Sequence, residues 1–419
     1  MRDKIIQVSE IPTNVGFNTT LEIASNNVIY FTHGFFKYPC KFIPHIPRWA
    51  ILKYTKKGDL VLDPFAGSGT ALVEAVLYNR DALGVDFDKL SQLLCKTKTV
   101  NLSTNQIERL KDIKKKLFTG TLNKSSFKPD IHNINHWFPK DNINDLLKLR
   151  EKINQIHYQL KDEKIYNLLL VCFASCIRKC SYADDTSPKP YVSTRFKKTP
   201  LSVTEAFLKT LNSYSRNIEK YKDKKMGKAF IISEDAREIK THKYDEKVSL
   251  AITSPPYINA FDYVRSLRLE NAWLGFYGDS NIMNMKRKQV GTEIISSNIY
   301  STDIAETGNE KLDFILPKIY EKDKKRTHIV FQFFKDMGKN IIEVKRLLKN
   351  GSHYIIVVGD SKIRGIEVPT HEILIDIAKL NGFKLDNLFS YIIKNRYLRI
   401  PRAGRGGLIK KDWVIDLVK

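Results

Sequence analysis

The stretch DLVLDPFAGSGTALVEAVLYNRDALGVDFD, residues 59–88, contains two apolar runs joined by a glycine-rich turn and an amphipathic segment. The runs DLVL and ALGVDFD have the length of buried strands, and ALVEAVLYNR between them has the apolar spacing of a helix. A strand, a helix and a second strand in this order are typical of a parallel sheet with helices packed against it. We therefore expect an α/β fold here.

Three later runs repeat this strand-like character, and a long helical segment separates them from the first two. They lie at 229–233, 248–252 and 353–358. The intervening segment shows helical periodicity, and its part from Arg178 to Lys228 holds 13 Lys and Arg against 5 Asp and Glu. We predict one sheet domain in two parts, 1–98 and 229–419, with a helical, basic insertion at 99–228 and a mobile polar insertion at about 279–328.

The composition suits a protein that binds a polyanion. Among 419 residues, 70 Lys and Arg outnumber 46 Asp and Glu, which gives a net charge of +24. This excess favours nucleic acid as a partner, although a lysine-biased genome would produce the same excess. The longest apolar run, 167–177, is too short to cross a bilayer, and the N-terminus lacks the pattern of a signal peptide. A cytoplasmic protein is expected.

The cysteines and histidines do not predict a metal site. Cys172, Cys176 and Cys180 recur every four residues, on one face of a helix, whereas zinc would need a fourth ligand and closer pairs. We expect these thiols to be reduced and to pack in the core. The histidines without ligand spacing are His33, His45, His136 and His371.

The turn DPFAGSGT, residues 63–70, has the properties of a ligand-binding loop. Gly67 and Gly69 allow backbone to pass close to a ligand, and the following helix offers free N–H groups. Asp63 at the start of the loop would repel a pyrophosphate but attract an ammonium group. Asp86 ends the next strand, at the position where nucleotide-binding α/β units hold the ribose diol. The alternative is a tight turn without a ligand. A ligand with both an amino group and a ribose fits best, and S-adenosylmethionine has both.

A second unusual corner, Ser254-Pro255-Pro256-Tyr257, ends the apolar run at 248–252. Its two prolines remove two backbone donors and fix φ twice, so the corner is stiff and presents carbonyl groups. Ligands of parallel sheets bind at the carboxyl ends of the strands, and the corner should lie there together with Asp63, Asp86 and Asp235. Taken alone, the corner is better explained as a strand-ending loop with an exposed tyrosine.

Together, DPFAGSGT and the later TSPPY resemble the motif pair of amino-methyltransferases that act on exocyclic amines of DNA bases. This family transfers methyl from S-adenosylmethionine to cytosine N4 or adenine N6. The resemblance covers most of the chain and implies a Rossmann-like methyltransferase sheet with helices on both faces. Other segments that are similar to the family, in a consistent order, are 31–51, 84–88, 233–239, 259–276 and 392–407.

The resemblance also implies roles for single residues. The Ser254 hydroxyl and the Pro255 carbonyl would accept hydrogen bonds from the base amine, and Tyr257 would offer an aromatic face to a base turned out of the duplex. The implied catalytic residues are Ser254, Pro255, Pro256 and Tyr257. The implied cofactor-binding residues are Asp63, Pro64, Phe65, Ala66, Gly67, Ser68, Gly69, Thr70, Asp86, Phe87, Asp235 and Ala236.

Serine at the first position of the catalytic motif usually accompanies cytosine-N4 activity in this family, so Ser254 favours cytosine. Target recognition in this arrangement lies between the two motifs, which points to 99–228 as the region that contacts double-stranded DNA. A role in restriction–modification, beside a separately encoded endonuclease, is implied. The candidate DNA contacts are Arg195, Lys197, Lys198, Arg396, Arg399 and Arg402.

Other functions remain open at this point. Adenine-N6 methylation of DNA is the nearest alternative, followed by methylation of an RNA base. A DNA-binding subunit without catalysis is disfavoured by the intact motif residues. A nicotinamide-dependent oxidoreductase would carry a third glycine in the loop, where this chain has Thr70-Ala71-Leu72.

Overall fold

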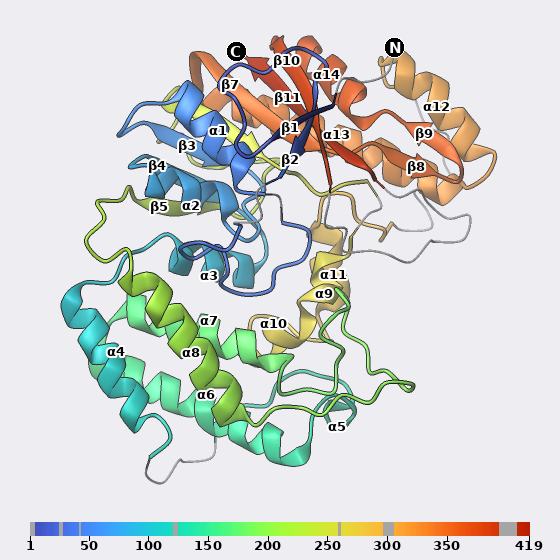
Figure 1. Cartoon of the computed structure of the whole chain (residues 1–419). Coiled ribbons are helices and arrows are strands. Elements are labelled where there is room, and N and C mark those ends of the chain that lie inside the picture. Colours follow the sequence, from blue (N-terminus) through green and yellow to red (C-terminus); the bar gives the residue numbers. More distant parts are fainter. Residues whose placement is uncertain are drawn as a thin grey trace.

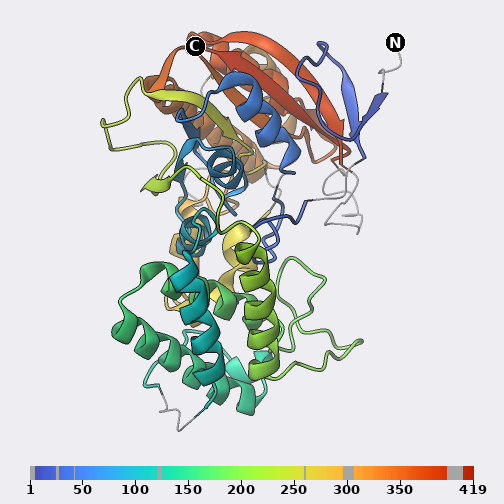
Figure 2. The same cartoon turned by 60° about the vertical axis from the view of Figure 1, so that its left-hand side comes forward.

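The computed structural model describes residues 5–24, 28–41, 43–119, 125–258, 261–295, 306–393 and 409–419. Figure 1 shows two parts: a sheet with helices against both faces above, and a group of helices that contains α4 to α8 below. Helices α3 (Lys89–Lys98) and α10 (Arg268–Leu274) lie between them. The view turned by 60° in Figure 2 shows the same division.

A nine-stranded sheet forms the centre of the upper part, in the order β1-β2-β10-β11-β7-β6-β3-β4-β5. Strand β11 is antiparallel to both of its neighbours, and the other neighbouring pairs are parallel. The strands are β1 (Ile5–Val8), β2 (Thr20–Ile23), β3 (Leu60–Asp63), β4 (Asp81–Val85), β5 (Ala229–Ser233), β6 (Val248–Thr253), β7 (Leu348–Val358), β10 (Lys384–Ile392) and β11 (Lys411–Val418), and β8 (Ser361–Ile363) and β9 (Ile366–Val368) form a separate hairpin.

Side chains alternate between the two faces of the sheet, which explains why helices cover both. Val61 of β3 packs with α1 (His45–Tyr54) and α2 (Thr70–Leu77), whereas the next residue, Leu62, packs on the opposite face. That face is covered by α12 (Glu310–Tyr320), α13 (Lys324–Leu347) and α14 (Thr370–Leu380). The predicted α/β class is confirmed, and β3, β4, β5, β6 and β7 lie at the five predicted runs.

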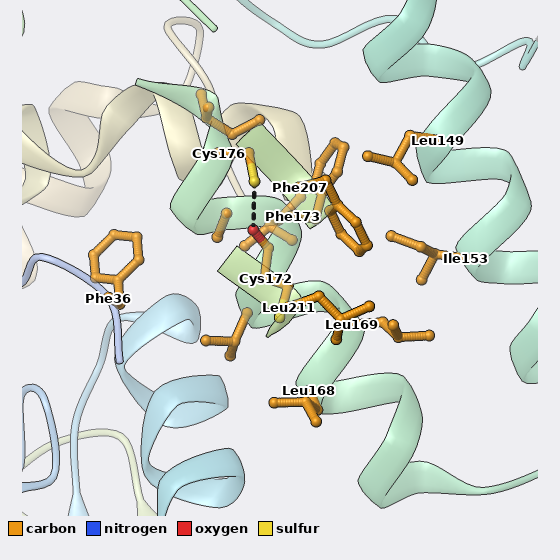
Figure 3. Packing of buried hydrophobic residues seen from close by; sticks show 14 of the residues in the cluster. Phe36, Leu149, Ile153, Leu168, Leu169, Cys172, Phe173, Cys176, Phe207 and Leu211 are labelled. Atoms are coloured by element: carbon orange, nitrogen blue, oxygen red, sulfur yellow. Dashed lines mark hydrogen bonds between the residues drawn. The ribbon is translucent and has the colours of Figure 1, made fainter. Parts of the chain in front are cut away.

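The lower part consists of α4 (Thr104–Lys116), α5 (Ile134–Trp137), α6 (Lys140–Leu160), α7 (Glu163–Ile177) and α8 (Val203–Glu219). These helices pack around an apolar core that also includes residues of α3 and of the 31–51 segment. Figure 3 shows Cys172 and Cys176 of α7 among Phe173, Phe207 and Leu211, with the Cys176 thiol 3.0 Å from the Cys172 carbonyl oxygen. All five thiols of the chain are free, and the helical cysteines pack in the core.

The two parts share a contact through α10, which follows the Ser-Pro-Pro-Tyr corner. Trp273 of α10 is fully buried, and its ring centroid lies 5.6 Å from that of Phe138 and 6.3 Å from that of Phe173. A segment from the second part of the sheet domain therefore completes the core of the inserted helices.

The segment 279–328 differs in part from the mobile insertion that was expected. It contains α11 (Ile282–Lys288), α12 and the start of α13, and α12 buries apolar residues against the sheet domain because its Leu312 and Leu316 recur with helical spacing. Residues 296–305 lie outside the described residues, as do Arg396, Arg399 and Arg402. Within the described ranges, no helix combines the length and apolar character needed to span a bilayer.

Candidate active site

A cavity of about 560 Å³ opens at the carboxyl ends of β3, β4, β5 and β6. The glycine-rich loop, the end of β4 and the Ser-Pro-Pro-Tyr corner all contribute to its wall. Twelve of the predicted site residues line it: Pro64, Phe65, Ala66, Gly67, Ser68, Thr70, Asp86, Phe87, Asp235, Ala236, Ser254 and Pro256. Four other predicted residues do not line the cavity, although each is adjacent in sequence to a residue that does: Asp63, Gly69, Pro255 and Tyr257.

The glycine-rich loop needs its glycines for two reasons. Gly67 and Gly69 have φ values of +49° and +77°, which side chains other than glycine rarely adopt. A Cβ atom at Gly69 would also lie 3.1 Å from the Cys95 Sγ atom. Behind the loop, the buried Lys98 ammonium group donates a hydrogen bond of 2.5 Å to the Ser68 carbonyl oxygen. The loop is thus held from behind, and its open side faces the cavity.

Asp63 lies behind the loop and joins the two motif strands. Its carboxylate accepts hydrogen bonds from the Thr253 hydroxyl at 2.7 Å and from the Phe65 N–H at 3.0 Å. Thr253 is the last residue of β6, and β6 is the neighbour of β3 in the sheet. Burial raises the pKa of Asp63 to about 7.

Asp86 and Asp88 bring two carboxyl groups to the cavity wall. Asp86 accepts hydrogen bonds from the N–H groups of Gly67 at 2.8 Å and Asp88 at 2.9 Å. Burial raises its pKa to about 7, and the nearby Asp88 acts in the same direction. Asp88 caps α3 and accepts hydrogen bonds from Tyr277 and Asn271.

These carboxyl groups fit a cationic, hydroxyl-bearing cofactor such as S-adenosylmethionine. Among the ion pairs of the described residues, none involves Asp63, Asp86 or Asp88. Buried carboxyl groups without a cation are costly, and a ligand that brings a positive charge and hydroxyl donors would relieve that cost. The donor set and the glycine loop therefore match the cofactor implied by the sequence.

Asp235, predicted to receive an amino group of the cofactor, is already paired within the protein. Arg237 donates to both oxygens of its carboxylate, at 2.9 and 2.8 Å, and a third bond of 3.1 Å anchors Arg237 to the buried Asp336. Although burial acts in the opposite direction, Arg237 lowers the pKa of Asp235. An ionised but neutralised carboxylate thus lines the cavity wall.

The Ser-Pro-Pro-Tyr corner brings Ser254 to the same cavity as the glycine loop. Pro255 is buried and Pro256 lines the wall, so the corner is fixed on both sides. The Tyr257 hydroxyl points away from the solvent and donates a hydrogen bond of 2.8 Å to Asp412 of β11. The structure therefore unites the two sequence motifs, 190 residues apart, at one site.

Aromatic residues that sequence reasoning did not single out complete the wall. Tyr38 and Tyr263 both line the cavity, with ring centroids 6.1 Å apart, and the Tyr38 hydroxyl lies 2.9 Å from that of Ser91. Cys40 and Asp88 were missed as well. These four residues lie in segments that resemble the amino-methyltransferase family, 31–51, 84–88 and 259–276. The resemblance of the segments did not indicate which of their side chains line the site.

A buried polar cluster holds the 31–51 segment against the glycine-loop helix. Glu74 of α2 is fully buried and contacts His33 at 2.6 Å, Arg48 at 3.3 Å and the Tyr30 hydroxyl. Burial lowers the pKa of His33 to about 4, which leaves Arg48 as the cation of the cluster at neutral pH. The cluster therefore fixes the segment that contributes Tyr38 to the wall.

The predicted DNA contacts in the inserted part divide into two kinds. Arg195 and Lys197 are exposed, and the Arg195 guanidinium lies 5.2 Å from the ring centroid of the exposed Phe196. Lys198 instead turns inward, since its ammonium group bonds to Asp185 at 2.9 Å and to two backbone carbonyls. These bonds hold the loop of Lys198 together, and the expectation that Lys198 contacts DNA stays a prediction.

Arg178 ties the same loop to the helices that follow the Ser-Pro-Pro-Tyr corner. Its guanidinium donates hydrogen bonds to the carbonyls of Ser187, Pro188 and Ser266, at 2.7, 2.7 and 2.6 Å, and pairs with Glu270 at 3.3 Å. One side chain thus joins the 184–198 loop to α9 (Tyr263–Ser266) and α10.

One grouping of potential metal ligands occurs in the described part of the chain. Ligand atoms of His353, Asp386 and Asp416 lie within 4.8 Å of one another. None of the three lines the cavity, and His353 is already engaged by Asp416 at 2.7 Å. The prediction that the protein uses no metal stays a prediction.

Comparisons with known proteins agree with this geometry. A family model for DNA methylases of the N6 and N4 type matches residues 13–92. The chain is 26% identical to the Type II methyltransferase M.MvaI of Kocuria varians, over 92% of this chain and 88% of that protein. It is 24% identical to M.BsoBI of Geobacillus stearothermophilus, over 91% and 84%.

A solved structure of an S-adenosylmethionine-dependent methyltransferase from Methanosarcina mazei is also similar, with a TM-score of 0.33, 11% identity and coverage of 88% of this chain and 96% of that one. Together with the cavity, the family match and the relatives support an S-adenosylmethionine-dependent DNA amino-methyltransferase, and they agree with either cytosine N4 or adenine N6 as the acceptor.

Proposed function

We propose that this protein transfers a methyl group from S-adenosylmethionine to the exocyclic N4 of cytosine in double-stranded DNA. One observation carries the proposal: Ser254, in a stiff Ser-Pro-Pro-Tyr corner, lines the same cavity as the glycine-rich loop and Asp86. A methyl donor held by the loop and an amine held by the corner would meet in that cavity.

The corner supplies what a base amine needs to become a nucleophile. The lone pair of such an amine is delocalised into the ring, and hydrogen bonds from both of its N–H groups to acceptors favour a more tetrahedral nitrogen. The Ser254 hydroxyl and the Pro255 carbonyl are such acceptors. Because the prolines fix the corner, these acceptors are preorganised, and positioning supplies much of the rate.

The cofactor would bind along the wall that carries the carboxyl groups. When bound, S-adenosylmethionine supplies a methyl group on a positively charged sulfonium. Asp86 would accept from ribose hydroxyls, Asp63 would add negative charge from behind the loop, and Asp235 would face the adenine amino group with Arg237 holding its carboxylate. The Tyr38 and Tyr263 rings would exclude water from that wall.

The choice of cytosine rests on Ser254, because a hydroxyl stands where the related adenine enzymes usually carry Asp or Asn. DNA is the proposed partner of the basic insertion 99–228, with Arg195 and Lys197 as exposed contacts. The relatives are Type II methyltransferases, which supports a role in restriction–modification.

Modification-sensitive sequencing of DNA from cells that express the protein tests the proposal. We expect N4-methylcytosine in one sequence context with the wild-type protein and none with Ser254→Ala, which should still bind S-adenosylmethionine. Ser249→Ala is the matched control, since Ser249 lies at the start of the same strand and its hydroxyl bonds Lys349 instead of facing the cavity.

Each other outcome contradicts a defined part of the proposal. N6-methyladenine would overturn the choice of base and leave the enzyme class intact. Equal methylation by the wild-type protein and Ser254→Ala would remove Ser254 from its role. An absence of modified bases with the purified, cofactor-binding wild-type protein on mixed DNA would contradict the activity itself.

A further inference from the structure

A buried carboxyl group stands directly behind the Tyr257 hydroxyl. Asp412 is 6% exposed, and its two carboxylate oxygens accept hydrogen bonds from Tyr257 at 2.8 Å and from Tyr391 at 2.9 Å. It lies at the start of β11, which runs antiparallel to β7, so this residue is at the edge of the sheet where the parallel strands end.

The neighbouring strand leaves space for this pair. Gly359 directly follows β7, and a Cβ atom there would lie 2.5 Å from the Ile409 Cγ2 atom, 3.0 Å from the Asp412 Oδ1 atom and 3.2 Å from the Tyr257 Cε2 atom. A larger residue would therefore collide first with Ile409 and would also crowd the carboxyl and the ring. The contact between Tyr257 and Asp412 therefore depends on close packing among three separate chain segments.

Both ends of the Tyr257 side chain are consequently fixed. Two prolines hold its backbone, and a charge-assisted hydrogen bond holds its hydroxyl, the stronger class of hydrogen bond in proteins. A ring restrained in this way loses little conformational freedom when it stacks on a base, because that freedom is already lost in the free protein.

We propose that Asp412 is a positioning residue for the proposed methyl transfer, acting through the Tyr257 hydroxyl to orient the ring against which the target base stacks. The inference rests on the proposed function. Asp412 lies more than 150 positions after the corner and belongs to neither sequence motif. The inference gives it the role of holding the Tyr257 ring in place.

A double-mutant cycle tests the coupling. Tyr257→Phe keeps the aromatic face and removes the hydroxyl, and Asp412→Ala removes the acceptor. Each change should lower kcat roughly ten- to a hundredfold, the range for loss of a hydrogen bond to a charged group, and leave the KM for S-adenosylmethionine within about twofold. The double variant should be no slower than the slower single variant, because both changes break the same bond.

Two further variants separate positioning from stability. Tyr391→Phe removes the other hydroxyl from the same carboxylate and should lower kcat by less than about threefold. Asp412→Asn keeps an acceptor oxygen and should recover most of the rate lost in Asp412→Ala. Fluorescence of 2-aminopurine at the target position, read without cofactor, should rise with the wild-type protein and with Tyr391→Phe, and much less with Tyr257→Phe.

Multiplicative losses in the cycle, or equal losses in Tyr391→Phe and Tyr257→Phe, would overturn the inference. If Asp412→Ala does not fold, comparing the kcat of Tyr257→Phe with that of Tyr391→Phe still tests the inference. Wild-type protein that binds S-adenosylmethionine but methylates no DNA would instead contradict the proposed function, so the two failures are distinguishable.

Discussion

Lowering the pH from 8 to 6 should weaken the binding of S-adenosylmethionine to this protein. Burial raises the pKa of Asp63 and of Asp86 to about 7, and the nearby Asp88 acts in the same direction on Asp86. A positively charged cofactor favours their ionised forms. Protons therefore compete with the cofactor, and each carboxyl that must ionise reduces the affinity as the pH falls below 7.

The expected size of the effect follows from these pKa values. A group with a pKa of about 7 is about nine-tenths ionised at pH 8 and about one-tenth ionised at pH 6. The Kd for S-adenosylmethionine should therefore rise about tenfold over this interval if one carboxyl must ionise, and about a hundredfold if both must. The tenfold case corresponds to about 1.4 kcal/mol.

The stability of the ligand-free protein should change in the opposite sense. A folded-state pKa raised above the unfolded value stabilises the protein at low pH, and this contribution is lost as the pH rises through the folded-state pKa. The free energy of unfolding should therefore fall by about 1.4 kcal/mol per carboxyl between pH 6 and pH 8 from these groups. Saturating S-adenosylmethionine should offset that loss.

Isothermal titration calorimetry at pH 6, 7 and 8, in buffers of matched ionic strength, measures the affinity. The control is Asp86→Asn, which should bind weakly at pH 8 and show a flatter pH dependence. A wild-type Kd that is constant within twofold from pH 6 to pH 8 would refute the assignment of these carboxyl groups to the cationic cofactor.

Two further predictions concern the supports of the site. Glu74→Gln should destabilise the protein by roughly 3 kcal/mol or more, because it leaves Arg48 without its buried partner, and it should weaken cofactor binding; chemical denaturation and calorimetry measure the two effects. Unchanged stability would show that the cluster contributes nothing. Arg178→Met should release the 184–198 loop, so that trypsin cleaves after Arg195 several times faster while cofactor affinity stays the same. Equal cleavage rates in the variant and the wild-type protein would contradict the anchoring role.

The sequence predicted the parts of the fold that depend on short-range patterns. Five strands were identified because their apolar runs are bounded by turn residues, and the glycine loop because Asp63 precedes it and Asp86 ends the next strand. Strands β1, β2, β10 and β11 were not predicted. Their stability depends on pairing with strands distant in the chain, such as β10 with β11 and β2, which local composition does not reveal.

In the site, too, short-range patterns predicted the motif residues but not the residues that bond to them. Most motif residues line one cavity, but two of their partners are distant in the chain: Asp412 bonds Tyr257, and Thr253 bonds Asp63. The bonds of Lys198 to two backbone carbonyls are equally invisible in the sequence, because the folded loop arranges those carbonyls. Pairings of this kind arise from tertiary structure and leave no spacing rule in the sequence.

The bond between Asp63 and Thr253 crosses from one half of the chemistry to the other. It links the strand that leads into the glycine-rich loop to the strand that leads into the Ser-Pro-Pro-Tyr corner. Under the proposed function, the distance between methyl donor and acceptor amine would be set by two paired strands and not by loops alone. The inserted helices are coupled to this framework along α10, whose Trp273 is buried among them.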